Sequence, residues 1–108
     1  MLEVEVVAQE ASVRGLALVR DGARGYADLV DQFRRALVSV ALNTSEGIGR
    51  HGGDRGHLLS VARGSAKEAS VALALLVAMG LVPAEPAGAV EVALDRVRAM
   101  LWRMAHRA

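Results

Sequence analysis

NTSEGIGR at residues 43–50 and ARGSAKE at residues 62–68 place polar side chains and glycines within the apolar stripes of two predicted helices. A packed helix face rarely holds such residues unless they bond to one another, because a buried polar group without a partner costs about 1–3 kcal/mol. In antiparallel neighbours the end of one helix lies near the start of the next, so the two segments predict one polar cluster in the seam. The predicted members are Arg35, Asn43, Glu46, Ser65 and Glu68, which together would fix the register of the two helices.

Apolar residues recur at helical spacing in four segments, at about residues 2–19, 26–48, 54–79 and 86–106. Glycines 47, 49, 52 and 53 are expected to end the second helix, and Asp54 to cap the third. Residues 21–25 are expected to form a turn, and Gly64 to let a neighbouring backbone approach closely. No strand alternation is present. Short links then predict one domain, residues 1–108, folded as an all-α, up-down-up-down antiparallel four-helix bundle.

The third helical segment is apolar on every side over its second half. No charged residue occurs between Glu68 and Glu85. A helix of this kind is buried all round, but a chain of 108 residues cannot cover it with three neighbouring helices. We therefore expect its excess apolar surface to meet another subunit.

The composition excludes several classes of protein. The chain has no cysteine, so it has neither a disulfide scaffold nor a cysteine-ligated metal. Its longest apolar run, residues 71–82, is too short to span a bilayer, and its first residues carry acids rather than a basic lead-in. We expect a cytoplasmic protein with no membrane association.

Catalytic motifs are missing from the sequence. His51, Asp54 and His57 match no standard metal-ligand spacing, and there is no P-loop or nucleophile elbow. Glu46 and Glu68 would form a lone carboxylate pair, which structural hydrogen bonding explains better. The sequence predicts no enzyme, no catalytic residue, no metal and no cofactor.

Arginines supply nearly all of the positive charge, because the chain has a single lysine. Six arginines are candidates for contact with nucleic acid, around the predicted second turn and in the fourth helix: Arg50, Arg55, Arg96, Arg98, Arg103 and Arg107. The formal net charge of only +1 and the lack of aromatic residues among them favour an ordinary solvated surface. Trp102 is expected to pack on the first helix or at a subunit contact, with a binding anchor as the alternative.

Between about residues 26 and 82 the sequence resembles the four-helix-bundle proteins of intervening sequences in bacterial large-subunit ribosomal RNA genes. The family pattern is matched, in order and spacing, by QFRRA at 32–36, NTSEG at 43–47 with GR at 49–50, ARGSAKE at 62–68 and MGL at 79–81. Thr44 and Ser45 replace the usual Ile-Ala, and the proline often found before Asn43 is missing. These departures concern packing rather than fold.

The resemblance implies a homo-oligomer, because relatives assemble as five-fold rings. It also implies one functional precedent, a more distant relative that serves diversity-generating retroelements as a nucleic-acid-binding accessory of a reverse transcriptase. The sequence therefore favours a non-catalytic, ring-forming pentameric scaffold or accessory protein. The alternative is an accessory that binds nucleic acid for a reverse transcriptase or another nucleic-acid enzyme.

Overall fold

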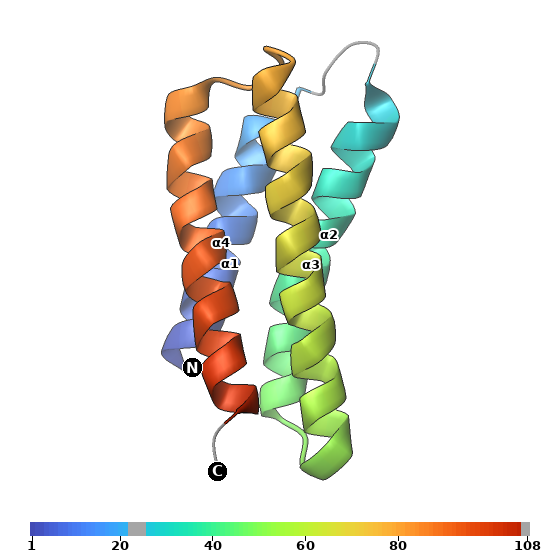
Figure 1. The fold of residues 1–108 in the computed structure, drawn as a ribbon, viewed down its shortest axis with the longest axis vertical. Helices are drawn as coiled ribbons and strands as arrows, with labels where there is room; N and C mark the ends of the chain where they lie inside the picture. Colours follow the sequence, from blue (N-terminus) through green and yellow to red (C-terminus); the bar gives the residue numbers. More distant parts are fainter. Residues whose placement is uncertain (22–25, 107–108) are drawn as a thin grey trace.

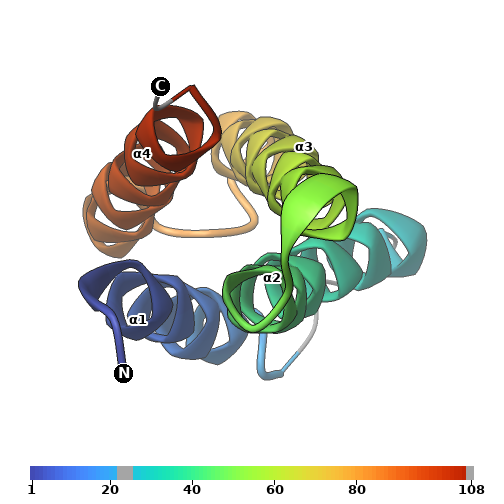
Figure 2. The same cartoon turned by 90° about the horizontal axis from the view of Figure 1, so that it is seen from below.

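Four helices form the bundle. In the computed structural model, which describes residues 1–21 and 26–106, they are α1 (Glu3–Leu18), α2 (Ala27–Ile48), α3 (Gly52–Ala78) and α4 (Ala84–Ala105). They run alternately up and down, and α1 packs on α2 and α4 while α3 lies at the opposite corner (Figures 1 and 2). The predicted all-α bundle is confirmed, and no strand occurs in the described ranges. The turn predicted at 21–25 lies outside them, apart from Asp21.

The helix boundaries lie within two residues of those expected, but the residue that caps the start of α3 is not the one expected. Its N-cap residue is His51, which makes no side-chain capping bond, and Asp54 lies inside the first turn. There the Asp54 carboxylate still faces the positive end of the helix dipole. Gly52 has φ +61°, a conformation that the tight α2–α3 connection requires and glycine adopts without strain.

Gly80 ends α3 through a Schellman motif. It has φ +74°, and its N–H donates to the Val77 carbonyl at 2.9 Å. The next N–H, from Leu81, donates to the Leu76 carbonyl at 2.9 Å. Both bonds satisfy carbonyls that the helix end would otherwise leave unpaired. Pro86 then lies in the first turn of α4, where its missing N–H costs nothing.

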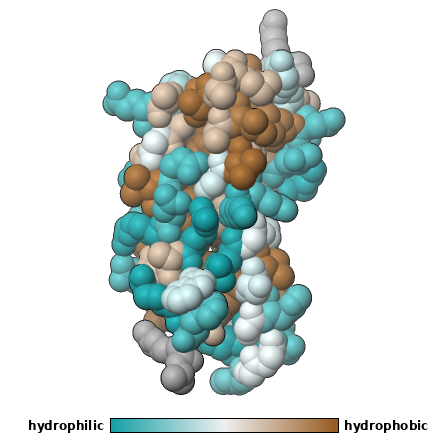
Figure 3. Space-filling view, viewed as in Figure 1, coloured by the Kyte–Doolittle hydropathy of each residue, from teal (hydrophilic) through white to brown (hydrophobic). Residues whose placement is uncertain are grey.

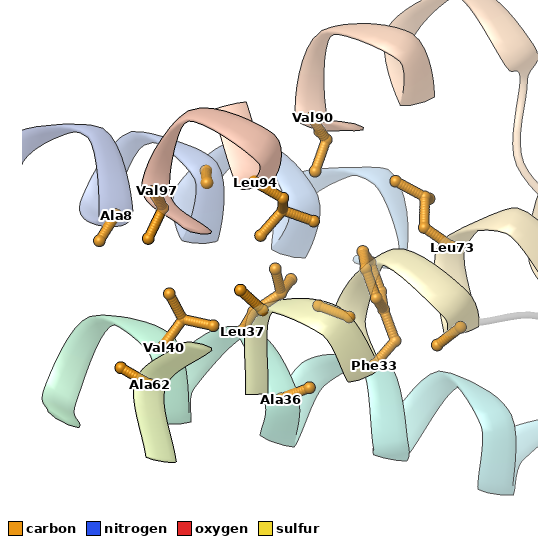
Figure 4. Packing of buried hydrophobic residues seen from close by; sticks show 14 of the residues in the cluster. Ala8, Phe33, Ala36, Leu37, Val40, Ala62, Leu73, Val90, Leu94 and Val97 are labelled. Carbon is orange, nitrogen blue, oxygen red and sulfur yellow. The ribbon is translucent and has the colours of Figure 1, made fainter. Parts of the chain in front are cut away.

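The core is aliphatic and receives side chains from all four helices. Its largest fully buried members are Phe33, Leu37, Leu59, Leu73, Leu76, Leu94 and Leu101. Figure 4 shows Phe33 and Leu37 of α2 facing Leu94 of α4 across the interior. Small residues such as Ala8, Ala62 and Ala66 are also fully buried, which lets the helices approach closely.

Two glycines inside helices, Gly47 in α2 and Gly15 in α1, also allow neighbouring helices to approach closely. A Cβ at Gly47 would lie 2.8 Å from Leu59 Cδ2, so α2 and α3 pack tightly near their connecting turn. A Cβ at Gly15 would lie 2.6 Å from Leu37 Cδ1, which gives α1 and α2 the same kind of contact. Gly47 was expected to help terminate α2, but it is a buried helical residue whose missing side chain makes room for Leu59.

Candidate functional site

The seam between α2 and α3 contains a small polar cluster centred on Ser39. The Ser39 and Ser65 hydroxyls are 2.7 Å apart and share a hydrogen bond between the two helices. Asn43 Nδ2 donates to the Ser39 hydroxyl and to the Ser39 carbonyl, each at 3.0 Å. Two of the five predicted members, Asn43 and Ser65, are therefore brought together through a residue that the sequence analysis missed. Its signal was its position, one helical turn before Asn43 on the same face.

The other three predicted members lie on the surface. Glu46 pairs with Arg50 at 3.1 Å, and both side chains are more than half exposed. Arg35 and Glu68 are exposed and form no ion pair or side-chain hydrogen bond with another described residue. Asp31, four residues before Arg35, pairs with Arg34 at 3.4 Å. Long charged side chains at the edge of the seam reach water, so they avoid the cost of burial.

An open groove of about 680 Å³ runs along the α2–α3 seam. We call it the α2–α3 groove, and its lining residues are Leu29, Gln32, Arg35, Ala36, Ser39, Gly64, Ser65, Lys67, Glu68, Val71, Ala72 and Leu75. Gly64 was expected to let a backbone of the same chain come close. Instead, a Cβ at Gly64 would meet nothing within 4 Å. The groove is therefore open at Gly64, beside Ser65, and its lining includes the charged side chains of Arg35, Lys67 and Glu68.

Exposed apolar side chains occur on both helices, but only Val71 and Leu75 line the groove itself. Val61 and Met79 are also exposed on α3, while Val38 and Leu42 of α2 line a separate hollow together with Arg34 and Asn43. Val71 is 53% exposed and Leu42 63% exposed, so the surface is open rather than partly covered. Figure 3 shows hydrophobic surface gathered over the upper part of α3. Within the single chain, α3 is thus covered only where it packs on α2 and α4, and its outer apolar side chains stay exposed.

Among the described residues, three buried side-chain oxygens have no hydrogen-bond partner that meets geometric criteria: Thr44 Oγ1, Ser70 Oγ and Glu91 Oε1. Thr44 is fully buried in α2, while Ser70 and Glu91 are neighbours on the facing helices α3 and α4. Burial raises the pKa of Glu91, and the nearby Asp95 carboxylate adds to this effect, while the Ser70 hydroxyl opposes it. A buried oxygen without a partner imposes a cost on folding.

Three of the six candidate arginines form ion pairs with acidic side chains of the same chain. The pairs are Arg50 with Glu46 at 3.1 Å, Arg96 with Glu3 at 2.9 Å, and Arg98 with Asp95 at 3.2 Å. The Arg96 pair joins α4 to the start of α1. All three lie on exposed side chains, where an ion pair contributes about 0–1 kcal/mol. Their charges are partly compensated within the chain.

Arg55 and Arg103 come together at the end of the bundle that holds the α2–α3 connection and the end of α4 (Figure 1). Both line a shallow hollow of about 340 Å³. Arg55 Nη1 also donates to the Ile48 carbonyl at 3.3 Å, which satisfies the end of α2. Arg107, the sixth candidate, lies outside the described residues.

Trp102 is 48% exposed at this same end of the bundle. Its ring stacks on His106, with centroids 4.2 Å apart and an interplanar angle of 16°. The contact is made within α4 and its C-cap rather than on α1. An aromatic surface therefore does lie near the arginines at this end, which the sequence analysis did not anticipate.

Neither metal ligation nor a membrane span emerges from the structure. Among the described residues, no three histidine or acidic side chains are grouped so that they could hold a metal ion. In the same part of the chain, no helix is both long and apolar enough to cross a bilayer.

The fold and the groove define a small antiparallel four-helix bundle with an uncovered apolar face between α2 and α3. The chain belongs to the 23S rRNA-intervening sequence protein family, whose model matches residues 23–103. This match confirms the resemblance carried by the segments at 32–36, 43–50, 62–68 and 79–81.

A solved structure supports the same fold. The chain is similar to a protein with unknown function from the S23 ribosomal protein family of Bacteroides thetaiotaomicron, with a TM-score of 0.86 and 19% sequence identity. The similarity covers 95% of this chain and 98% of that one. No curated protein matches the chain. Neither the family description nor the solved relative names a catalytic activity.

Proposed function

We propose that this protein is a non-catalytic, self-assembling helical module that uses the α2–α3 groove as its association face. The observation that carries this proposal is the groove itself, an open channel whose lining includes the exposed Val71 and Leu75, with four more exposed apolar side chains elsewhere on the same two helices. Contiguous apolar surface of this kind is typical of interaction sites on small proteins. The charged residues at its edge, Arg35, Lys67 and Glu68, offer both signs to a partner.

The energetics favour a partner that is itself apolar. Fully burying a Val, Leu or Met side chain contributes about 1.5–3 kcal/mol, so covering the exposed part of each groove residue contributes about 1 kcal/mol. Association costs about 4–15 kcal/mol in lost freedom of motion. Covering all six half-exposed apolar side chains of α2 and α3 would therefore contribute only about as much as the lower end of that cost. A stable complex therefore needs apolar area from the opposite surface as well.

For the number of subunits we propose five, the ring that the sequence resemblance implies. Light scattering of the purified chain should then give a mass near five times 11.4 kDa. A monomer at micromolar concentration would refute self-assembly, whereas a different multimer would refute only the number.

A substitution at Gly64 tests whether the groove is the association face. Gly64→Arg adds a long charged side chain at the Ser39–Ser65 end of the groove and should yield a folded monomer, because a Cβ added there meets nothing within 4 Å. Gly88→Arg is the matched control, since Gly88 is also an open helical glycine but lies on α4. The control should retain the wild-type mass. A Gly64→Arg variant with the wild-type mass would exclude the groove.

Nucleic-acid binding is the second proposed function, as an accessory of a reverse transcriptase or another nucleic-acid enzyme. It is favoured by Arg55 and Arg103 lining one hollow, with the exposed Trp102 ring at the same end of the bundle. A ring would repeat this end in every subunit and so multiply a modest positive charge. Against it stand the ion pairs of Arg50, Arg96 and Arg98.

A titration with single-stranded RNA at low and high salt tests this second function. Binding through phosphates should be strongest at low salt and weaken steeply as salt is added. Arg103→Ala should weaken it, while Arg20→Ala, at the opposite end of the bundle, should not. Absence of binding at low salt would remove this function and leave self-assembly intact.

A further inference from the structure

The four helices contribute unequally to the core, and α1 contributes least. It is the shortest of them, with 16 residues. In the described part of the chain, each of the other three helices supplies at least two of the largest fully buried side chains, such as Phe33 and Leu37 of α2. The buried residues of α1 are all no larger than valine: Val4, Val7, Ala8, Ala11, Ser12 and Gly15. Apolar burial therefore holds α1 less strongly than it holds α2, α3 and α4.

Polar contacts position α1 on the rest of the bundle. In its middle, the Ser12 hydroxyl donates to the Leu37 carbonyl at 2.7 Å. At its C-cap, the Val19 carbonyl accepts a bond from Arg34 Nη2 at 2.6 Å. The third contact is the exposed ion pair of Arg96 with the first turn of α1. Each of these contacts has a small net value, because water replaces it when the helix detaches.

A detached α1 would not persist as a helix. Helices of about this length are marginal in water, and α1 contains an internal glycine and several valines, which lower helix propensity. The other three helices keep their mutual contacts, because α3 packs on both α2 and α4 and lies at the corner opposite α1 (Figure 2). A Cβ at Gly15 would lie 2.6 Å from Leu37 Cδ1 and 3.3 Å from Phe33 Cζ. It is therefore α1 that covers these two large side chains.

We infer that α1 is a strap that opens as one unit while α2, α3 and α4 stay packed. Segments with few large buried side chains are the ones that open first in a folded protein. The open state uncovers Phe33 and Leu37, an apolar face that is distinct from the α2–α3 groove and that α1 itself occupies when closed. The strap is a property of the single folded chain, so it goes beyond self-assembly and nucleic-acid binding and depends on neither.

Hydrogen exchange of backbone amides at increasing, sub-denaturing guanidinium concentrations tests the strap. The amides of α1 should exchange together and be less protected than the slowest amides of α3. Their exchange should also depend only weakly on denaturant, because opening α1 exposes much less surface than unfolding the whole chain. Protection and denaturant dependence equal to those of α3 would overturn the inference, because α1 would then open only when the whole chain unfolds.

Two matched substitutions test the same separation by a second route. Ala8 of α1 and Ala62 of α3 are both fully buried. Ala8→Gly should speed exchange in α1 by roughly fivefold, the effect expected of a glycine inside a helix. Ala62→Gly should speed exchange in α3 and leave α1 unchanged, because the contacts of α3 persist when α1 opens. Circular dichroism checks that both variants stay folded. Acceleration of α1 by Ala62→Gly as large as that of α3 would overturn the inference.

Discussion

At the scale of single residues, Glu91 lies partly buried between α3 and α4, with its Oε1 atom unpaired. Burial raises its pKa above the ordinary value of 4.5, and Asp95 adds to this effect, while the Ser70 hydroxyl and Arg98 oppose it. Because the folded-state pKa is raised, the stability linked to protonated Glu91 is present below pH 4.5 and is lost as pH rises through the folded pKa. Ionised Glu91 therefore destabilises the bundle near neutral pH.

Glu91→Gln should accordingly raise the melting temperature near neutral pH, by a few degrees at most because the side chain is only partly buried. The gain should shrink when melting is measured well below pH 4.5, where wild-type Glu91 is itself neutral. Glu10→Gln, at an exposed position in the middle of α1, serves as the control and should change little. A gain that is independent of pH would contradict the electrostatic explanation.

Thr44 gives the second prediction at this scale. Its side chain is fully buried, and its hydroxyl has no hydrogen-bond partner. Thr44→Val preserves the shape and removes the unpaired hydroxyl, so it should stabilise the fold by about 1 kcal/mol. Chemical denaturation measures this gain, with Ser45→Ala as a neighbouring exposed control that should stay within about 0.5 kcal/mol of wild type. Destabilisation by Thr44→Val would show that the hydroxyl is bonded.

At the scale of helices, Gly47 sets how closely α2 and α3 approach. Gly47→Ala should destabilise by about 1–3 kcal/mol, the usual cost of overpacking. The added Cβ would lie 2.8 Å from Leu59 Cδ2 and 3.2 Å from Leu58 Cβ, and the latter moves only with the backbone. Gly88→Ala has open space and should instead stabilise by about 0.5–1 kcal/mol through helix propensity. Equal effects of the two substitutions in denaturant titrations would refute tight packing at Gly47.

The helices themselves could be predicted from sequence because apolar spacing and glycine or proline signals are local. The Gly80 stop and the first-turn Pro86 follow from backbone chemistry alone. Contacts between helices depend on how far each helix is rotated about its axis. That rotation is set by packing against distant residues, which periodicity specifies only coarsely.

The polar seam illustrates this limit. Residues 43–50 and 62–68 did indicate where α2 and α3 meet, and Asn43 and Ser65 do lie in the seam. A modest rotation decides whether position 46 or 68 faces the neighbouring helix or water, and both face water. Ser39 was missed because its only signal, a position one helical turn before Asn43, is too weak to single out a helical serine.

At the scale of the whole molecule, the single chain is a folded bundle whose uncovered surface lies mainly beside α3 and on α1. If copies of the chain associate through these surfaces, folding and assembly become linked by mass action. The melting temperature of the wild type should then rise with protein concentration, because the assembled state binds the folded chain and not the unfolded one. This thermodynamic signature does not depend on how many subunits the ring contains.

Calorimetry over a wide range of protein concentration measures the linkage directly. Gly64→Arg, with its groove filled, should melt at one temperature at every concentration, while Gly88→Arg should follow the wild type. The comparison separates assembly from intrinsic stability, because both variants add the same side chain to an open helical position. A wild-type melting temperature that stays constant would mean that the groove remains exposed to water. The bundle would then be stable without covering it.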